Sequence, residues 1–436
     1  MTVAIALFTR DLRVHDNPVL HAAARSADQV IPLFVLDKGI QAGPNRARFL
    51  AECLRDLDAA LAEAGSGLVI RRGDPVAQVA KLVREHDVRT VHVAKDYSGY
   101  AQRRERALAE LGVDLHVHDD AVVVVPPGTV TPQNADHFSV FSPYHRRWAE
   151  VPVRKPLRRP TKLNSPDVRS DTLPPIKKAA PDLIEGGETN ARKLIRAWDV
   201  EGYAAGHDDL AGDKTSHFSA HLHFGSVSPV ELVHAFGTES DSAKAFVRQL
   251  AWRDFNHQLL AARPEVAHED FRPNGVTWRK SDEDLERWKT GRTGFPIVDA
   301  GMRQLLREGW MHNRARLIVG SFLTKTLLID WRLGARHFLD HLVDGDIANN
   351  QLNWQWVAGT GTDTRPGRVL NPLRQAERYD PDGAYVRRYV PELAGLDAPA
   401  IHKPWTVAAE LDYPEPMVEL ARGRERYQSA RQQSLF

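Results

Sequence analysis

The chain has little of several features that would each indicate a particular class of protein. It has one cysteine, Cys53, in 436 residues, so it can form no internal disulfide and no Cys-rich zinc module. No apolar run approaches the roughly 20 residues of a membrane helix, and the run at 3–8 is too short for a signal peptide. The 58 basic and 57 acidic side chains give a net charge of +1, which excludes a histone-like surface. We therefore expect a cytoplasmic protein that makes no contact with a membrane.

Two common nucleotide-binding motifs are also missing. The first apolar run is followed by Thr9-Arg10-Asp11-Leu12-Arg13, which does not match the G-x-G-x-x-G pattern of dinucleotide sites. The string nearest to a P-loop, Gly212-Asp213-Lys214-Thr215, has Asp where that loop requires Gly. Ordinary NAD and Walker-type sites are thus excluded. A local basic groove for nucleic acid stays possible on a nearly neutral protein.

The N-terminal part alternates short apolar runs with helical patterns. Runs rich in Val, Ile and Leu predict strands at 3–8, 30–36, 68–71, 90–94 and 121–125. Helical spacing or helix-opening prolines separate most of these runs. This alternation predicts a parallel sheet with helices on both faces, and a nucleotide-sized ligand at the carboxyl ends of the strands.

The rest of the chain differs in kind. The segment 151–182 contains seven prolines and many basic residues, which predicts a surface linker without regular structure. After Asn190 the strand patterns disappear and helical periodicity recurs. The predicted fold class is therefore α/β followed by all-α. The predicted domains are an α/β domain at 1–128, an interdomain linker at 129–189 and a helical domain at 190–436.

His217, His221 and His223 form a cluster that could suggest a metal site. On a helix, His217 and His221 would share a face but His223 would point elsewhere, and no Cys or Glu-x-x-His partner is near. We expect no metal there. Thr215, Ser216 and Ser219 in the same stretch favour phosphate binding, because hydroxyls and free backbone N–H groups would meet at a helix start. The alternative is ordinary helix capping.

The most informative segment is 344–356. It holds two acids, several amides and two tryptophans within 13 residues, which are hard to place in an apolar core. If 349–356 is helical, Asn350 and Trp354 share a face, whereas Trp354 and Trp356 lie about 200° apart. One tryptophan would then face a buried polar ligand and the other a separate cavity. The alternative is two bulky side chains that pack on either side of a helix.

These segments, in this order, resemble the DNA photolyase/cryptochrome family. The resemblance is carried by 8–13 with Asp16-Asn17, 252–255, 293–300, 309–316 and 344–363. It covers essentially the whole chain and is closest to class I cyclobutane pyrimidine dimer photolyases. It implies a Rossmann-like antenna domain, a helical FAD-binding domain, and light-driven repair in which reduced FAD splits pyrimidine dimers in DNA. The alternative is a flavin-binding blue-light photoreceptor, although only 20 residues follow Pro416, which leaves little room for a signalling tail.

The resemblance also implies a cofactor site. The implied FAD-binding residues are Tyr203, Thr215, Ser216, His217, Phe218, Ser219, Arg316, Asp344, Gly345, Asp346 and Asn350. Arg316 and Asp344 would form an ion pair beside the isoalloxazine, and Asn350 would face flavin N5. An amide can donate or accept a hydrogen bond, so it tolerates N5 in either protonation state. Plant cryptochromes have an acid there and animal ones a cysteine, so Asn350 favours repair over signalling.

Electron transfer and substrate binding are implied in the same way. Trp354, Trp331 and Trp278 match the family's tryptophan chain for photoreduction, and their separations of 23 and 53 residues require tertiary packing to bring them together. The implied substrate residues are Gln249, Trp252, Asn313, Arg314, Leu317, Trp356 and Arg368. Trp252 and Trp356 would form the walls of a pocket for a flipped dinucleotide, and Arg314 and Arg368 would bind phosphates.

Two of these positions depart from the family's pattern. Gln249 and Leu317 stand where many class I enzymes have Glu and Met, which leaves the lesion preference open. The motif reads Asn313-Arg314 where (6-4) photolyases have a catalytic His, which argues against that lesion. We further expect a monomer whose partner is DNA containing pyrimidine dimers. A second chromophore, either 8-hydroxy-5-deazaflavin or methenyltetrahydrofolate, would bind the first domain, and no local signature decides between the two.

Overall fold

The computed structural model describes residues 1–40, 42–408 and 410–433, which form two compact units. Unit 1 comprises 1–178, 184–201 and 216–265. Unit 2 comprises 179–183, 202–215 and the described chain from Val266 onward. Each unit is thus assembled from separate stretches of sequence. The domain boundaries predicted from the sequence divide the chain differently and stay a prediction.

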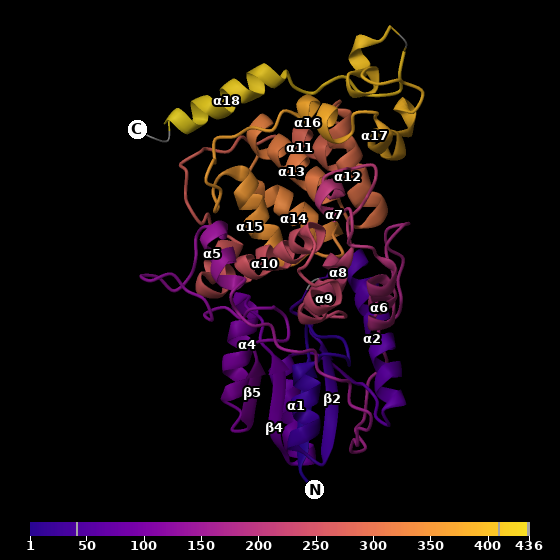
Figure 1. The fold of residues 1–436 in the computed structure, drawn as a ribbon, viewed down its shortest axis with the longest axis vertical. Helices are drawn as coiled ribbons and strands as arrows, with labels where there is room; N and C mark the ends of the chain where they lie inside the picture. Colours follow the sequence, from indigo (N-terminus) through magenta and orange to yellow (C-terminus); the bar gives the residue numbers. More distant parts are fainter. Residues whose placement is uncertain (41, 409, 434–436) are drawn as a thin grey trace. The chain divides into compact units, whose positions relative to one another are not determined.

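Unit 1 is built on a parallel five-stranded sheet with the strand order β3-β2-β1-β4-β5. Figure 1 labels β2, β4 and β5 of this sheet. The strands are β1 (Val3–Phe8), β2 (Gln29–Leu36), β3 (Val69–Arg72), β4 (Val88–Ala94) and β5 (Asp114–His118). They are connected by α1 (Pro18–Ser26), α2 (Pro44–Glu63), α3 (Pro75–His86) and α4 (Gly99–Ala109). The central strand β1 is buried along its whole length, as its continuous apolar sequence predicts.

The fifth strand does not lie where the sequence predicts it. The run 121–125 is a buried loop, and the polar segment 114–118 is the edge strand instead. The backbone N–H groups of Val124 and Val125 donate to the buried Asp254 carboxylate at 3.0 and 2.9 Å. Because a side chain satisfies these polar groups, the apolar run can be buried without joining the sheet.

The segment 151–182 contains no helix or strand, as predicted, and it covers the opposite edge of the sheet. Ile70 of β3 accepts the N–H of Asp171 at 2.8 Å and donates its own N–H to Ser170 Oγ at 2.9 Å. The linker therefore occupies backbone groups that an edge strand would otherwise offer to another chain.

The remaining regular structure of both units is helical. Unit 1 adds α5 (Phe141–Trp148), α6 (Glu188–Ala197), α8 (Phe218–Phe224), α9 (Pro229–Phe236) and α10 (Asp241–Ala262). Unit 2 contains α7 (Tyr203–Gly206), α11 (Asp282–Lys289), α12 (Pro296–Glu308), α13 (Asn313–Ser321), the π-helix η2 (Phe322–Thr326), α14 (Trp331–His341), α15 (Ile347–Ala358), α16 (Pro372–Tyr379), α17 (Ala384–Tyr389) and α18 (Leu420–Gln433). In the part of the chain that the structure describes, no strand follows β5, which confirms the predicted fold class. None of these described helices has the length and apolar character needed to cross a membrane.

Helix α15, which carries most of the informative segment, packs closely on α14. A Cβ atom at Gly334 of α14 would overlap the ring of Trp354, so glycine is required for this approach. Trp354 in turn lies in a core that includes the fully buried Trp331 and Trp288. The core of unit 2 thus fixes both the position and the rotation of α15.

Candidate functional site

An ion pair beside α13 forms the centre of the candidate site in unit 2. The Arg316 guanidinium lies 2.8 Å from Asp344 Oδ2, and Arg316 Nε donates to the Met311 carbonyl at 2.8 Å. Asp344 is buried, and its other oxygen, Oδ1, has no hydrogen-bond partner among the described residues. A buried carboxylate oxygen without a partner is costly. Asp344 Oδ1 is therefore placed to accept a hydrogen bond from a bound molecule.

Asp346 begins α15 as its N-cap. Its Oδ1 accepts hydrogen bonds from the backbone N–H and the side-chain amide of Asn349, both at 2.8 Å. The N–H of Asp346 donates to the carbonyl of Asp344 at 2.7 Å, across Gly345. The cap thus has a structural role of its own and holds Asp344 next to Arg316.

Asn350 lies on the buried side of α15. Its amide nitrogen donates to the carbonyl of Ala335 and to Gln351 Oε1, both at 3.0 Å. Because both N–H groups are used within the protein, the side chain offers only its oxygen to a ligand. The sequence predicts that the Asn350 amide can either donate or accept a hydrogen bond. In the structure, only its oxygen is available to accept one from a ligand.

The two glutamines of α15 anchor a loop. Gln351 Nε2 donates to the carbonyl of Ala267 at 2.7 Å. Gln355 donates to the carbonyls of Val266 and Glu269 at 2.7 and 3.0 Å, and accepts the N–H of Phe271 at 2.7 Å. Part of the amide content of this segment therefore serves the fold rather than a ligand.

Tyr203 and Thr215 also belong to unit 2. Tyr203 is buried in α7, and burial together with the nearby Asp208 carboxylate raises the pKa of its phenol to about 12. Tyr203 is thus a neutral hydroxyl at physiological pH. Thr215 Oγ1 donates to Asp213 Oδ1 at 2.7 Å, which fixes the direction of the Thr215 hydroxyl.

The stretch 216–219 lies at the start of α8 in unit 1. The helix begins at Phe218, so the hydroxyls of Ser216 and Thr215 do precede a helix, as predicted. His217 adopts a left-handed backbone, with φ of 54°. The Phe218 ring packs in an aromatic cluster with Trp198, Phe236 and Phe246. Only the backbone of Phe218 could therefore contact a ligand.

The tryptophans of the predicted electron-transfer chain meet in one core. Trp331 and Trp354 are buried there, and Trp278 packs against it. Trp331 Nε1 donates to Asp270 Oδ1 at 2.8 Å. The Trp354 ring also makes an edge contact with Trp288, with ring centroids 6.0 Å apart. Tertiary packing thus gathers residues that are far apart in sequence.

Trp354 and Trp356 have different surroundings, as helical geometry predicts. Trp354 is 4% exposed, whereas Trp356 is half-buried. The Arg368 guanidinium lies over the Trp356 ring, 5.5 Å from its centroid. The outer side of α15 therefore presents an aromatic ring and a cation together, a combination suited to a nucleic-acid base and a phosphate.

The substrate residues predicted on α13 lie in its first turns. Asn313 and Leu317 are four residues apart and share a face of the helix. Arg314 binds Asp208 through two short contacts of 2.7 and 2.8 Å, and lies 4.3 Å from the Tyr379 ring centroid. Arg314 would have to exchange this partner to bind a phosphate, so Arg368 is the stronger candidate.

Gln249 and Trp252 lie on α10 in unit 1. Gln249 is exposed, and its amide nitrogen lies 3.5 Å from the Ala245 carbonyl. The Trp252 ring stacks on Phe141 of α5, with centroids 3.6 Å apart and planes 6° apart. Phe141 covers one face of the indole, so a base could stack only on the opposite face.

The histidine cluster is not arranged as a metal site. His221 is buried, its Nδ1 lies 2.9 Å from Ser226 Oγ, and burial lowers its pKa to about 4. His221 therefore belongs to the core of unit 1. Within the described ranges, no group of three or more His, Cys, Asp or Glu side chains could hold a metal ion.

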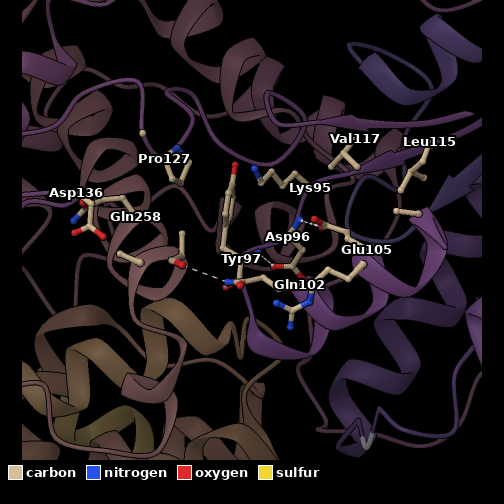
Figure 2. Close-up of a pocket in the computed structure, with 15 residues that line it drawn as sticks. Lys95, Asp96, Tyr97, Gln102, Glu105, Leu115, Val117, Pro127, Asp136 and Gln258 are labelled. Carbon is tan, nitrogen blue, oxygen red and sulfur yellow. Dashed lines mark hydrogen bonds between the residues drawn. The ribbon is translucent and has the colours of Figure 1, made fainter.

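A cavity of about 680 Å³ opens in unit 1 beside the carboxyl end of β4 (Figure 2). It is lined by Lys95, Asp96 and Tyr97 after β4, by residues of α4 and β5, and by the last turn of α10. Asp96 also forms an ion pair with Arg10, the second residue after β1, at 3.3 Å. This cavity therefore lies at the carboxyl end of β4, one of the strand ends where the sequence predicts a ligand.

Two family models match this chain. The model for DNA photolyase matches residues 4–161, and the model for the FAD-binding domain of DNA photolyase matches 246–433. The deoxyribodipyrimidine photo-lyase of Streptomyces griseus is 53% identical over 452 aligned positions, which cover 99% of each chain. The chain belongs to the DNA photolyase family.

Solved photolyase structures share the complete architecture. A class III photolyase from Agrobacterium tumefaciens matches with a TM-score of 0.94 at 34% identity, over 100% of this chain and 98% of that one. An archaeal photolyase from Sulfolobus tokodaii, solved with two FAD molecules, matches with a TM-score of 0.89 at 30% identity, over 99% and 100%. These matches confirm the predicted α/β and helical parts.

The residues of unit 2 fit the FAD of a photolyase. The isoalloxazine ring carries both N–H donors and acceptor atoms, and unit 2 offers a complementary set. Asp344 Oδ1 and the Asn350 oxygen are acceptors, and the Arg316 guanidinium is a cation beside them. In unit 1 the stretch 216–219 has hydroxyls and backbone N–H groups at a helix start.

Sequence reasoning missed several partners of the predicted residues. They are Asp208 beside Arg314, Asp270 beside Trp331, Trp288 beside Trp354 and Phe141 beside Trp252. Asp208 and Asp270 lie 106 and 61 residues from their partners. Periodicity reports only on neighbours along one element, so it carries no signal for such pairs.

Proposed function

We propose that this protein is a deoxyribodipyrimidine photo-lyase, which uses blue light and reduced FAD to split cyclobutane pyrimidine dimers in DNA. The arrangement of α15 carries the proposal. Its buried side holds Asn350 and Trp354, and its outer side holds Trp356 beneath Arg368. One helix thus joins a cofactor site and a redox path to a surface for bases and phosphates. The full-length similarity to photo-lyases supports the same activity.

When bound, FAD would supply the electron that opens the dimer and recover it afterwards. Arg316 and Asp344 would hold the ring through the ion pair and the available Asp344 Oδ1. Asn350 would accept a hydrogen bond at N5, which suits the protonated N5 of a reduced flavin. Burial of Asn350 and Asp344 would keep water from these contacts.

Trp354, Trp331 and Trp278 would supply electrons to FAD when it is oxidised. Indole rings are suitable relay stations because edge contacts within a core suffice to connect them. The hydrogen bond from Trp331 to Asp270 fixes the orientation of the middle ring, and Arg332 is 2.9 Å from the same carboxylate. The carboxylate favours a positively charged Trp331 ring, and Arg332 offsets part of this effect.

Aromatic and basic side chains would bind the substrate. Trp252 and Trp356 are the proposed stacking residues for a flipped dimer, and Arg368 would bind a backbone phosphate. Stacking is worth about 1–3 kcal/mol per base, which recovers part of the unstacking cost. Gln249, Asn313 and Leu317 would contact the lesion, and none of the three brings a charge.

A second chromophore would occupy the cavity of unit 1. Its volume of about 680 Å³ lies within the range of small-molecule sites. Either 8-hydroxy-5-deazaflavin or methenyltetrahydrofolate is the candidate, and an absorbance peak beyond those of FAD would identify it. Ala262→Trp, at the cavity wall, should abolish that peak and leave the FAD bands unchanged. We further infer that the protein acts as a monomer in the cytoplasm.

Release of the cofactor tests the FAD site directly. Protein purified from flavin-replete cells should release about one FAD per chain on heating. Asp344→Asn should retain much less, because it removes the negative partner of Arg316. A supernatant without FAD from the unmodified protein would overturn the proposal.

A further inference from the structure

The segment that carries Arg368 has no regular secondary structure. Residues 359–371, between α15 and α16, contain no helix or strand. Within this segment the backbone makes local turns, such as the N–H of Arg368 with the carbonyl of Arg365 at 3.1 Å. A turn of this kind does not by itself fix the direction of an exposed arginine. The position of Arg368 over Trp356 therefore depends on what holds 366–370 from outside.

One side of the π-helix η2 and the residue before it hold that segment. Lys325 Nζ donates to the carbonyls of Pro366 and Arg368 at 2.9 and 2.8 Å. Ser321 Oγ accepts the N–H of Leu370 at 3.1 Å. A π-helical turn places residues four to five apart on one side, and such turns occur often at functional sites. The π-helix thus directs Ser321 and Lys325 at the same stretch of backbone.

Lys325 is buried to a degree that lysine rarely reaches. It is 2% exposed, and burial lowers its pKa to about 8, with Asp363 opposing and Arg368 and Arg431 adding to that shift. Lys325 therefore stays protonated near pH 7. A buried ammonium is tolerated when its N–H groups are bound, and two carbonyls of the Arg368 segment bind them here.

Helix α18 closes this arrangement from the other side. Tyr427 Oη donates to the same Pro366 carbonyl at 3.0 Å, and Lys325 Nζ lies 5.6 Å from the centroid of its ring. A Cβ atom at Gly423 would lie 2.9 Å from atoms of Thr326, so α18 packs closely on the π-helix. Tyr427 is 1% exposed. Helix α18, yellow in Figure 1, therefore contributes to the burial of Lys325 through Tyr427.

We propose that Lys325 is a positioning residue for DNA binding, which holds the backbone of 366–368 so that the Arg368 guanidinium stays over Trp356. The inference rests on the proposed role of Arg368 as a phosphate contact. Lys325 is too buried to reach DNA itself, so its effect on binding passes through Arg368. No role in catalysis is needed for this effect.

The test is a double-mutant cycle of Lys325→Met and Arg368→Ala. Methionine keeps the length of the side chain but removes the Lys325 donor from the Arg368 carbonyl and leaves the Pro366 carbonyl with Tyr427 Oη alone. In this variant the backbone of 366–368 is less fixed before DNA binds and must be ordered on binding. The entropy cost of this ordering should weaken DNA affinity by roughly five- to 30-fold. In the Arg368→Ala background, Lys325→Met should change affinity less than about twofold, because the residue it positions is gone. The matched control is Lys280→Met, the same substitution at an exposed lysine of unit 2.

Two further readouts separate positioning from other roles. In the Arg368→Ala background, Lys325→Met should leave the salt dependence of binding unchanged, whereas a direct phosphate contact would lower it further. Trypsin should cleave the bond after Arg368 faster in Lys325→Met than in the unmodified protein.

If Lys325→Met does not fold, Tyr427→Phe and Ser321→Ala can replace it in the same double-mutant cycle. Each of these variants removes one hydrogen bond to the segment 366–370.

The outcomes are distinct. If the losses of DNA affinity in Lys325→Met and Arg368→Ala multiply in the double variant, the two residues act independently. That result would overturn the positioning role of Lys325 and leave Arg368 as a phosphate contact. Unchanged binding in Arg368→Ala alone would overturn the phosphate contact and the inference with it. Loss of affinity in Lys325→Met that disappears in the Arg368→Ala background would support both.

Discussion

Replacing Trp356 with alanine should separate recognition of the lesion from binding of DNA. Trp356 is half-buried, and its ring supports the Arg368 guanidinium 5.5 Å from the centroid. Base stacking is worth about 1–3 kcal/mol, so Trp356→Ala should weaken dimer-containing DNA by roughly five- to 150-fold. Loss of the cation–π contact, worth about 0.5–1 kcal/mol at an exposed site, should weaken undamaged DNA only about two- to fivefold.

Fluorescence anisotropy in the dark would measure both affinities at two salt concentrations. The duplexes should differ by a single thymine dimer. Trp356→Phe is the matched control, because it keeps an aromatic ring and should keep most of the preference for the dimer. Arg368→Ala should instead weaken both DNAs to a similar degree and lower the salt dependence by about one phosphate. Equal losses for both DNAs in Trp356→Ala would refute Trp356 as a wall of the lesion pocket.

Three further outcomes follow from the core of the protein. Trp278→Phe should block photoreduction of oxidised flavin, followed by absorbance, and leave repair by pre-reduced protein nearly intact; photoreduction at the unmodified rate would remove Trp278 from the chain. Burial raises the pKa of the Cys53 thiol to about 12, so native protein should react with a thiol reagent at pH 8 far more slowly than unfolded protein; rapid native labelling would contradict this. The pKa of His221 is lowered from 6.5 to about 4, so the unfolded state binds more protons between these values. The free energy of unfolding should therefore fall as the pH drops from 6.5 towards 4, and at pH 5 it should be about 2 kcal/mol lower than at neutral pH. Urea unfolding at pH 7.5 and 5 should show a smaller fall in His221→Asn, and identical falls would exclude His221 as the cause.

Local patterns along the sequence predicted those parts of the site that one element fixes. If 349–356 is helical, the different surroundings of Trp354 and Trp356 follow from the helical repeat alone, and the structure shows α15 there. Strands β1 to β4 follow from apolar runs, with boundaries within three residues. In each case the side-chain pattern within a single helix or strand predicts which of its residues are buried.

Features that depend on distant partners could not be predicted in this way. The run 121–125 has the composition of a strand, yet the Asp254 carboxylate satisfies its backbone and lets it remain a loop. Arg314 was predicted as a phosphate contact, but Asp208 already pairs with it. Asn350 was predicted to donate or accept, and the Ala335 carbonyl together with Gln351 uses its donors. In all three cases a polar partner from another segment decides the chemistry.

Repair in light tests the central claim most directly. Reduced protein would be mixed with an oligonucleotide that contains one thymine dimer, exposed to blue light, and the restored thymines measured by chromatography. The account predicts many dimers opened per protein in light and none in the dark, and a strong loss of repair in Trp356→Ala at low DNA concentration. Flavin that is reduced by light, together with dimers that stay intact, would contradict the account.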